Sequence, residues 1–571
     1  MFREYPDRNE YKRHRAILTE GVKIGLNEPY PIRLTNNNPT FSISDKIGIG
    51  EQLQKWLRTG VVIGPYDMKY AQRHNVTLNM LFGIPKPDTS TRPILNMSDK
   101  SKIGYSVNDK LDPKLCTVEY AQTKQVVETV KALGIGAWLW AKDLKDGYYN
   151  VQVHKSDVPK LGFIFEGKIY LFERLPMGLS SSPKIFTDFM NFPVWAIKNN
   201  KPDIYYVSVP TNTIDLNNFI SNADVKSSRG ITTIAIIFYY LDDILGGHPN
   251  ETVAWQQFHH SESILKLLSL KTKESKAKPP AQTQKWLGKL YDTVRQWLSL
   301  PPDKVKQYVS DLQRVINMRS IKKRYLLSHI GRTRHMASIY RPLAAFARNL
   351  EVWAYKCNHL DHHIRITAPL RKDLKLCIWG MQRAAQYGIS FDQFLKPMDI
   401  PDITIHTDAS LLIGIGGISD KGHWFQNKWS DVTIHNSNMR DIVWRELVAI
   451  YVMIYSLRNE CKNKVLHVYT DNEGCKYMLI NMRCDLRRPD LQAIINEICK
   501  ICIEYAIIPW FEHIPGKDNV IADALSRYKP NPFNSAAKYN KQINTTAALQ
   551  YASDLCRDIA IKPKLLNMAD T

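Results

Sequence analysis

The chain has 571 residues, which is too long for a single hydrophobic core and predicts about three to five folding units. Its content of 44% hydrophobic and 23% charged residues is that of a globular protein and excludes a chain that is disordered throughout. Lys and Arg outnumber Asp and Glu by 77 to 55, and the resulting net charge of +22 favours nucleic acid as a partner over a role in solubility alone.

The cysteines and the chain start bear on the compartment. Among nine scattered cysteines, Cys499 and Cys502 lie close together, in an apolar stretch without the second pair or histidine that a zinc site needs. We interpret them as reduced core thiols. Residues 1–15 are charged and lack the apolar core of a signal peptide, and the apolar run at 231–241 is too short to cross a bilayer. We therefore expect an intracellular protein, cytoplasmic, nuclear or both, without a membrane partner.

Changes in polarity and periodicity predict six segments. They are an N-terminal arm (1–45), a mixed α+β region (46–290) with a polar surface insertion (about 199–230), a helical region (291–390), a linker (391–402), a second α/β unit (403–528) and a C-terminal tail (529–571). In the helical region, Val305, Val309 and Leu312 recur at the spacing of one helix face. The tail is rich in Asn, Lys and Ala, and we expect it to be mobile.

Two apolar segments of the mixed region run into carboxylates. The first ends at Asp143, and the second reaches Asp242 and Asp243 before it returns to apolar residues. An Asp-Asp pair in a loop is usually a solvated turn, but two like charges at the tip of an apolar hairpin indicate a divalent cation that neutralises them. Nucleotidyl transfer needs this arrangement, because two Mg²⁺ ions held by aspartate oxygens clamp the attacking 3′-oxygen and the leaving pyrophosphate. We expect Asp143 and Asp242 to carry the metals, with Asp243 beside them.

The segment Tyr240-Leu241-Asp242-Asp243 resembles the Tyr-x-Asp-Asp box of reverse transcriptases, and Asp143 with its neighbours resembles their first catalytic motif. The resemblance implies an α+β fold of the right-hand polymerase type, with fingers and palm over 46–290 and a helical thumb over 291–390. Tyr148 occupies the position of the family's aromatic residue that crowds the 2′ position of the sugar. It therefore implies a preference for deoxynucleotides; the alternative is a packed core ring.

Two further stretches resemble parts of the family that bind the nucleotide. The segment 175–186 is similar to the motif that packs under the template and the incoming nucleotide, and it contains Met177 and Gly178. Gly178 would allow close backbone approach, because glycine has no Cβ. Lys86 and Arg92 match the fingers residues that hold the triphosphate, where cations offset charge that develops during phosphoryl transfer. Outside this context, both would be interpreted as solvated surface.

A third stretch, 285–290, resembles the primer grip, a hairpin that supports the primer end. The resemblance implies that Trp286, Leu287 and Gly288 contact the primer and template. Lys276 corresponds, in a looser alignment, to a lysine proposed to protonate pyrophosphate.

Four acids follow the linker, on predicted strand ends and one helix: Asp408, Glu446, Asp471 and Asp523. Each alone would be a helix cap or a turn, but together they form a metal cage suited to phosphodiester hydrolysis. Their order and spacing resemble ribonuclease H, which implies an α/β ribonuclease H-like domain over 403–528. Many members have a mobile histidine before the last aspartate. Here Lys517 falls in that position, and whether His513 substitutes for it is left open.

Together these motifs resemble the reverse transcriptase and ribonuclease H of an LTR-type retroelement. They are most similar to those of the DIRS group and of gypsy-type retrotransposons. The resemblance implies an RNA-directed and DNA-directed DNA polymerase whose ribonuclease H activity degrades the RNA strand of hybrids. Its partners would be an RNA template, a DNA primer, the RNA-DNA hybrid and dNTPs. Its cofactor would be Mg²⁺, two ions per active site, with Mn²⁺ as a substitute.

Two alternatives compete with this hypothesis. An RNA-dependent RNA polymerase or a telomerase-like protein is disfavoured by Tyr148 and by the appended nuclease motifs. A host-captured scaffold that binds nucleic acid without catalysis is disfavoured by the seven acids, because a scaffold has no use for clusters of like charge. The primer, the integration route and the oligomeric state are left open.

Overall fold

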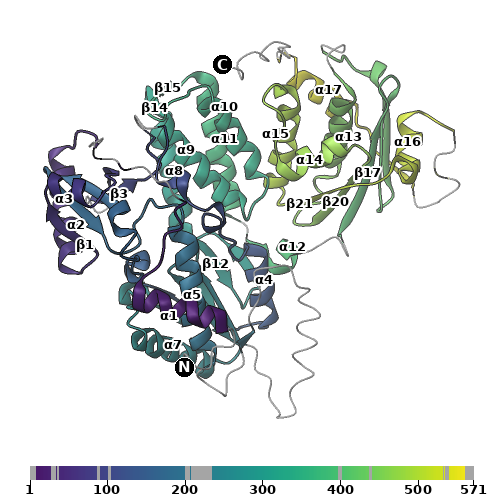
Figure 1. Ribbon diagram of the computed structural model, residues 1–571. Coiled ribbons are helices and arrows are strands. Elements are labelled where there is room, and N and C mark those ends of the chain that lie inside the picture. Colours follow the sequence, from purple (N-terminus) through teal and green to yellow (C-terminus); the bar gives the residue numbers. More distant parts are fainter. Residues whose placement is uncertain are drawn as a thin grey trace. The chain divides into compact units, whose positions relative to one another are not determined.

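The computed structural model divides the chain into two compact units (Figure 1). Unit 1 comprises Met1–Leu287 and Asp292–Arg295, and unit 2 comprises Gly288–Tyr291 and Gln296–Thr571. The structure describes residues 8–27, 32, 34, 38–85, 91–100, 104–199, 206–207, 235–386, 388–395, 401–435, 440–530, 533, 539–557 and 559. Lys86 and nearly all of the insertion expected at about 199–230 therefore lie outside the described residues.

Unit 1 mixes helices with small sheets. Its helices are α1 (Arg8–Glu20), α2 (Ile43–Arg58), α3 (Met68–Arg73), α4 (Thr123–Ala132), α5 (Ser182–Asn199) and α7 (Glu251–Leu267). Its strands are β1 (Val62–Tyr66), β2 (Met80–Pro85), β3 (Thr91–Asn96), β4 (Trp138–Asp143), β5 (Gly162–Phe165), β6 (Lys168–Phe172), β7 (Tyr206–Val207), β8 (Ala235–Tyr240), β9 (Asp243–His248), β10 (Lys278–Ala281) and β11 (Thr283–Trp286). The expected α+β class is confirmed.

The main sheet of unit 1 has the strand order β10-β4-β9-β8-β7. Strand β9 runs antiparallel to both β4 and β8, whereas β7 is parallel to β8. Apolar side chains of these strands, such as Leu139, Ile237 and Ile244, are buried. Glycine is required at Gly246, because a Cβ there would lie 2.1 Å from the ring of Trp140. This close packing fixes β4 against β9.

The N-terminal segment, expected to be an arm outside the core, packs into unit 1 where it is described. Ile17 and Ile24 are buried in the hydrophobic core, and the backbone N–H of Ile24 donates to Asp157 at 2.9 Å. The expectation rested on the polar and Asn-rich composition of residues 1–45. A few apolar positions are enough to anchor such a segment, because each buried side chain contributes about 1.5–3 kcal/mol.

Unit 2 combines a helical part with a six-stranded sheet. Its helices are α8 (Pro302–Ile316), α9 (Lys323–Ala337), α10 (Leu343–Ala354), α11 (Ala368–Ala384), α12 (Phe391–Leu395), α13 (Ile442–Leu457), α14 (Glu473–Asn481), α15 (Pro489–Glu504), α16 (Val520–Ser526) and α17 (Thr546–Leu555). Its strands are β13 (Trp297–Ser299), β14 (Ser320–Lys322), β15 (His363–Arg365), β16 (Ile389–Ser390), β17 (Ile403–Ala409), β18 (Gly414–Ser419), β19 (His423–Lys428), β20 (Val465–Thr470), β21 (Ile508–His513) and β22 (Lys541–Gln542), and β12 (Lys289–Asp292) lies where the units meet in sequence.

The six-stranded sheet has the order β21-β20-β17-β18-β19-β22. Strands β17, β20 and β21 are parallel, β18 is antiparallel to both β17 and β19, and β22 is parallel to β19. Helices α13, α14 and α15 lie on one side of this sheet and α16 on the other (Figure 1). A Cβ at Gly416 would lie 2.4 Å from Leu525 Cβ, so α16 needs a glycine in β18 to pack this closely.

The helical part and the sheet part of unit 2 are joined by contacts as well as by the linker. The backbone oxygen of Cys484 accepts a hydrogen bond from Arg348 of α10 at 3.1 Å, and Asn496 of α15 donates to Asn349 of α10 at 3.2 Å. The two compact units divide near residues 287–296, and the linker predicted over 391–402 lies inside unit 2.

The C-terminal tail, expected to be mobile, is ordered over residues 539–557. Strand β22 pairs with the edge of β19, and α17 buries Ala548, Leu549 and Ala552 in unit 2. Composition concealed this element, because alanine serves equally in a solvated tail and on a tightly packed helix face. In the part of the chain that the structure describes, no helix combines the length and apolarity needed to cross a membrane.

Candidate active sites

Three aspartates of unit 1 meet at one end of its main sheet. Strands β4 and β9 are in register with Asp143 opposite Asp243. The turn from β8 to β9 contains Leu241 with a φ of 52° and then Asp242, whose backbone oxygen accepts the N–H of Leu144 at 2.8 Å. The structure thus brings together the three acids that the sequence predicts.

Two lysines balance the charge of these acids. Lys273 Nζ lies 2.9 Å and Lys276 Nζ 2.7 Å from the two carboxylate oxygens of Asp143. Lys276 therefore lies at the site that the loose alignment suggested. Lys273 was missed by sequence reasoning; the only signal was its place in a lysine-rich run directly after an apolar helix.

Burial and mutual repulsion make the other two aspartates hard to ionise. Burial raises the pKa of Asp242, and the nearby charge of Asp143 adds to the effect. Burial, followed by repulsion from Asp242 and Asp143, raises the pKa of Asp243 to about 6. Such a cluster of hard oxygen ligands suits a divalent cation, whose charge would favour the ionised forms.

A cavity of about 440 Å³ opens beside the acids. It is lined by Arg92, Tyr148, Met177, Asp242 and Lys276 among others. Three of the predicted nucleotide-binding residues thus share one cavity with a predicted metal ligand.

Gly178 follows Met177, which lines the cavity, and lies against the backbone of strand β3. Its φ is +106°, and a Cβ there would lie 1.9 Å from the backbone oxygen of Leu95. Both facts require glycine at this position. The expected close backbone approach is therefore present, and its partner is β3.

Tyr148 belongs both to the cavity and to the packing around it. Its ring lies edge-on to Phe186 with 5.4 Å between centroids, and burial raises the pKa of its hydroxyl. The neighbouring Gly147 lies close to Asp242, because a Cβ there would be 3.6 Å from Asp242 Cβ. Tyr148 is consequently held beside the acids by a packed ring.

The segment expected to contact the primer forms a tight turn after β11. Leu287 and Gly288 have φ values of 45° and 76°. Trp286 is only 2% exposed, with its ring 6.4 Å from that of Phe238. Trp286 is thus a core residue that supports the turn, and the two residues after it are the partly exposed ones.

In unit 2, Asp408, Glu446 and Asp471 form a cluster in which the first two are buried and Asp471 is half-buried. Asp408 lies near the end of β17, Asp471 follows the neighbouring parallel strand β20, and Glu446 lies on α13. Each contributes an oxygen, and these oxygens lie within 4.8 Å of one another. Parallel strands end at the same edge of a sheet, so β17 and β20 bring Asp408 and Asp471 close together.

The cluster concentrates negative charge in a small volume. Burial raises the pKa of Asp408 to about 6 despite a hydrogen bond from Ser526. Burial, then the charges of Asp408 and Asp471, raises the pKa of Glu446 well above its usual value. One Glu446 oxygen accepts the N–H of Ala409 at 3.2 Å, and the other is buried without a hydrogen-bond partner. These residues fit a divalent cation, which would satisfy the free oxygen and the excess charge.

Asp523 lies beside this cluster but is neutralised by cations. Arg527 Nε and Lys529 Nζ donate to its two oxygens at 2.5 and 2.7 Å. Burial alone would raise the pKa of Asp523, but these hydrogen bonds lower it below its usual value. His513, whose part was left open, ends β21 with its ring nitrogen 3.1 Å from the backbone oxygen of Asp471.

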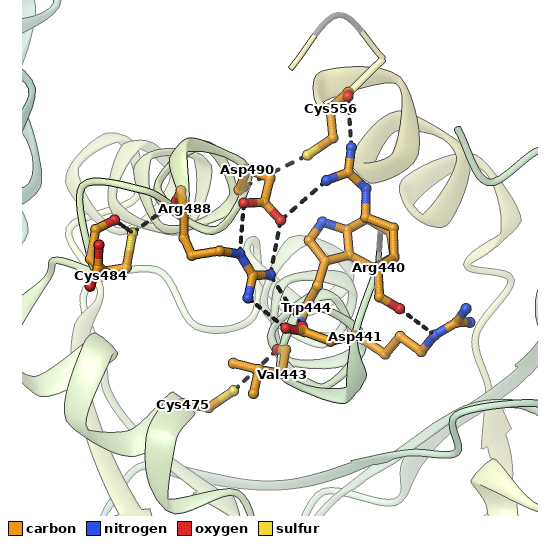
Figure 2. Close-up of polar contacts among 11 residues, drawn as sticks. Arg440, Asp441, Val443, Trp444, Cys475, Cys484, Arg488, Asp490 and Cys556 are labelled. Carbon is orange, nitrogen blue, oxygen red and sulfur yellow. Dashed lines mark hydrogen bonds and ion pairs between the residues drawn. The ribbon is translucent and has the colours of Figure 1, made fainter. Parts of the chain in front are cut away.

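A buried ionic network, missed by the sequence analysis, fixes the start of α13 (Figure 2). Arg440 pairs with Asp490 at 3.1 Å, and both side chains are fully buried. Arg488 bridges Asp490 at 3.0 Å and Asp441 at 2.5 Å. Asp441 caps α13, because its carboxylate accepts the N–H of Trp444 at 3.0 Å. The network therefore holds the helix end that precedes Glu446 by about one turn.

The same network fastens the C-terminal helix. Arg440 donates to the backbone oxygen of Cys556, just after α17, at 2.8 Å (Figure 2). Arg440 thus links the two ends of the chain segment 440–556, which contains Glu446 and Asp471 of the acidic cluster.

Comparison with known proteins shows similarity to reverse transcriptases and to Pol polyproteins. Residues 84–290 match the family model described as reverse transcriptase (RNA-dependent DNA polymerase). The chain is 22% identical over 419 residues to the retrovirus-related Pol polyprotein from transposon opus of Drosophila melanogaster, covering 70% of this chain and 35% of the relative. It is 20% identical over 443 residues to that from transposon gypsy of the same organism, covering 73% and 36%.

Viral proteins are also similar. The Pro-Pol polyprotein of Simian foamy virus type 1 is 26% identical over 175 residues, which cover 30% of this chain and 13% of the relative. A solved structure of the foamy viral protease-reverse transcriptase with double-stranded DNA has a TM-score of 0.46 and 13% identity, covering 90% of this chain and 80% of that one. The chain spans about a third of the length of the two transposon relatives.

Proposed function

Given that residues 84–290 belong to the reverse transcriptase family, we propose that this chain is the polymerase and nuclease part of an LTR-type retroelement Pol protein. It copies RNA, and then DNA, into DNA and degrades the RNA strand of the resulting hybrid. The similarity to Pol polyproteins of the transposons opus and gypsy supports the LTR type. The affinity to the DIRS group stays a prediction.

The observation that carries the polymerase is the meeting of Asp143, Asp242 and Asp243 beside a cavity that Arg92 and Tyr148 line. The aspartates would hold two Mg²⁺ ions, with Mn²⁺ as a substitute, and the metals supply positive charge at the attacking and leaving oxygens when bound. We assign the domains as predicted: fingers and palm over 46–290, thumb over 291–390, linker over 391–402 and ribonuclease H over 403–528.

The other residues of the polymerase site bind and orient. Arg92, together with Lys86, holds the triphosphate, and Tyr148 closes the space beside the 2′ carbon of the sugar. Met177 and Gly178 form the floor under the incoming nucleotide. The turn of Leu287 and Gly288, supported from the core by Trp286, positions the primer end. These groups act by holding reactants in a reactive geometry.

The nuclease rests on Asp408, Glu446 and Asp471, with Asp523 as the fourth acid. They would hold two metals, which activate water and stabilise the leaving 3′-oxygen when bound. The cluster, its raised pKa values and the unpaired Glu446 oxygen support this proposal. The substrates and partners are an RNA template, a DNA primer, dNTPs and the RNA-DNA hybrid.

Primer extension on an RNA template, with product and template read from the same reaction, tests both activities. We expect Asp242→Asn to lower synthesis by orders of magnitude, because metal charge contributes several kcal/mol at the transition state, while cleavage of a preformed hybrid persists. Asp408→Asn should do the reverse. Equal thermal melts must first establish that both variants are folded.

Loss of both activities from either substitution in a folded protein would refute the two-site assignment. A wild-type chain that binds hybrid but neither extends nor cleaves it, with Mg²⁺ or with Mn²⁺, would favour the captured scaffold instead.

A further inference from the structure

The cavity beside the polymerase acids has a wall that none of the sequence motifs includes. Gln52, Lys55 and Trp56 of α2 form this wall, and Arg92 also lines the cavity. The buried stripe of α2 consists of Ile49, Leu53 and Trp56. Gln52 and Lys55 flank this stripe, so the amphipathic helix presents its polar edge to the cavity.

Helix α2 packs closely against the β2–β3 hairpin, and this contact limits their movement relative to each other. A Cβ at Gly48 of α2 would lie 2.8 Å from the Thr91 side chain, and one at Gly83 of β2 would lie 2.5 Å from the same side chain. Thr91 directly precedes Arg92. Lys55 and Arg92 are therefore presented to the cavity by one packed pair of elements.

The cavity collects positive charge. Its lining contains four cations (Lys55, Arg92, Lys273, Lys276) and two carboxylates (Asp146, Asp242). Lys273 and Lys276 already pair closely with Asp143, at 2.9 and 2.7 Å. Lys55 has a much looser partner, because its Nζ lies 3.9 Å from Asp146 and both side chains are about half exposed. An exposed pair at this distance is weak, so a stronger anion in the cavity can recruit Lys55.

We propose that Lys55, with Gln52 beside it, is a further binding residue for the triphosphate of the incoming nucleotide; this inference rests on the proposed polymerase function. A triphosphate carries several negative charges, and a lysine ammonium on a flexible stem binds phosphate oxygens as a mobile point charge. Arg92 reaches the same cavity from the neighbouring strand, so the two side chains contact the phosphates from adjacent positions. Gln52 adds an amide donor.

Single-nucleotide incorporation at saturating primer-template tests this with Lys55→Ala, Lys55→Arg and the control Lys46→Ala. Lys46 is an exposed lysine of the same helix that does not line this cavity. We expect Lys55→Ala to raise the KM for the dNTP roughly tenfold and to leave kcat within about twofold, because it removes uniform binding. Inhibition by inorganic pyrophosphate should weaken in parallel. Lys55→Arg should retain most of the affinity, and Lys46→Ala should match wild type.

Two outcomes overturn the inference in an active enzyme. One is an unchanged dNTP KM together with unchanged pyrophosphate inhibition in Lys55→Ala. The other is weaker binding of primer-template at unchanged KM, which would assign Lys55 to a nucleic-acid strand. An inactive wild-type chain would refute the proposed function, and this inference with it, whereas an active wild type confines the failure to Lys55.

Discussion

At the residue scale, Tyr148 combines a packing role with the selection of the sugar that we propose for it. Its ring is held edge-on by Phe186 and forms part of the cavity wall beside Asp242. A side chain that is fixed in this way can exclude a 2′-hydroxyl sterically, because it cannot move aside without losing its contact with Phe186. On the proposed function, selection of the sugar would depend on the size of the ring and on its support, and not on its hydroxyl.

We predict that Tyr148→Ala incorporates ribonucleotides at least about tenfold more efficiently relative to deoxynucleotides, because a missing steric block is worth on the order of 1–3 kcal/mol. The ratio of kcat/KM for the two sugars measures this. Tyr148→Phe keeps the ring and should keep the discrimination. If Tyr148→Ala discriminates as wild type does, another residue excludes the ribose.

A second residue, His329 of α9, should make stability depend on pH. Burial, with the nearby charge of Arg332 adding, lowers the pKa of His329 to about 4, below its ordinary value near 6.5. The unfolded chain therefore binds a proton more readily than the folded protein does. This contribution to stability is complete above about pH 6.5 and is lost as pH falls toward 4.

We predict that His329→Leu, which cannot titrate, loses less stability between pH 7 and 5 than wild type does. The difference should be on the order of 1–2 kcal/mol, given the depressed pKa and partial solvent screening. Denaturant unfolding of both proteins at several pH values measures it. Parallel stability curves would show that His329 is not the group responsible.

At the element scale, the start of α13 depends on a contact with the end of the chain. Arg440 pairs with buried Asp490 and holds the segment after α17 through the oxygen of Cys556. Glu446, a predicted metal ligand, lies one turn into α13. A displacement of this helix end would therefore displace Glu446 as well. The exposed pair of Arg487 and Asp485 lies near the same elements without this connection.

We predict that Arg440→Met costs about 1–3 kcal/mol of stability, because buried Asp490 loses a hydrogen bond while Arg488 still compensates its charge. Hybrid cleavage should also need a higher Mg²⁺ concentration for half-maximal rate, while DNA synthesis keeps its own Mg²⁺ dependence. The matched control Arg487→Ala removes a surface pair worth about 0–1 kcal/mol and should change neither property. A destabilised Arg440→Met with an unchanged Mg²⁺ dependence would limit the network to stability alone.

At the scale of the whole molecule, the charge of +22 should dominate the binding of nucleic acid. Contacts with phosphates release counterions, so affinity falls steeply as salt rises. The cations that line the polymerase cavity are too few to account for this surplus. Much of the surplus positive charge is therefore available to bind nucleic-acid strands outside the two acidic sites.

We predict that the affinity for a hybrid duplex falls about a thousandfold between roughly 50 and 200 mM salt, as expected for about six phosphate contacts. Fluorescence anisotropy at several salt concentrations gives the slope. A slope near zero would mean that the excess lysines and arginines do not face nucleic acid.

The sequence by itself determined the acids of both sites and the α+β class. Asp143, Asp242, Asp408 and Asp471 each lie at or just after the end of an apolar strand, and strand period and turn position are local properties that a sequence encodes directly. Tyr148 was identified through the resemblance to reverse transcriptases, from its position after Asp143 in the family's first catalytic motif.

Only the tertiary structure decided which charged groups meet those acids. Lys273, which no motif included, pairs with Asp143 at 2.9 Å from a distant segment of the chain, and Lys55 reaches the cavity from a helix outside every motif. Packing likewise placed Trp286 in the core, ordered α17 and put the helices after residue 296 in one unit with the six-stranded sheet. The physical reason is that burial and pairing depend on surfaces brought together from distant segments, and local patterns of polarity carry no record of such partners.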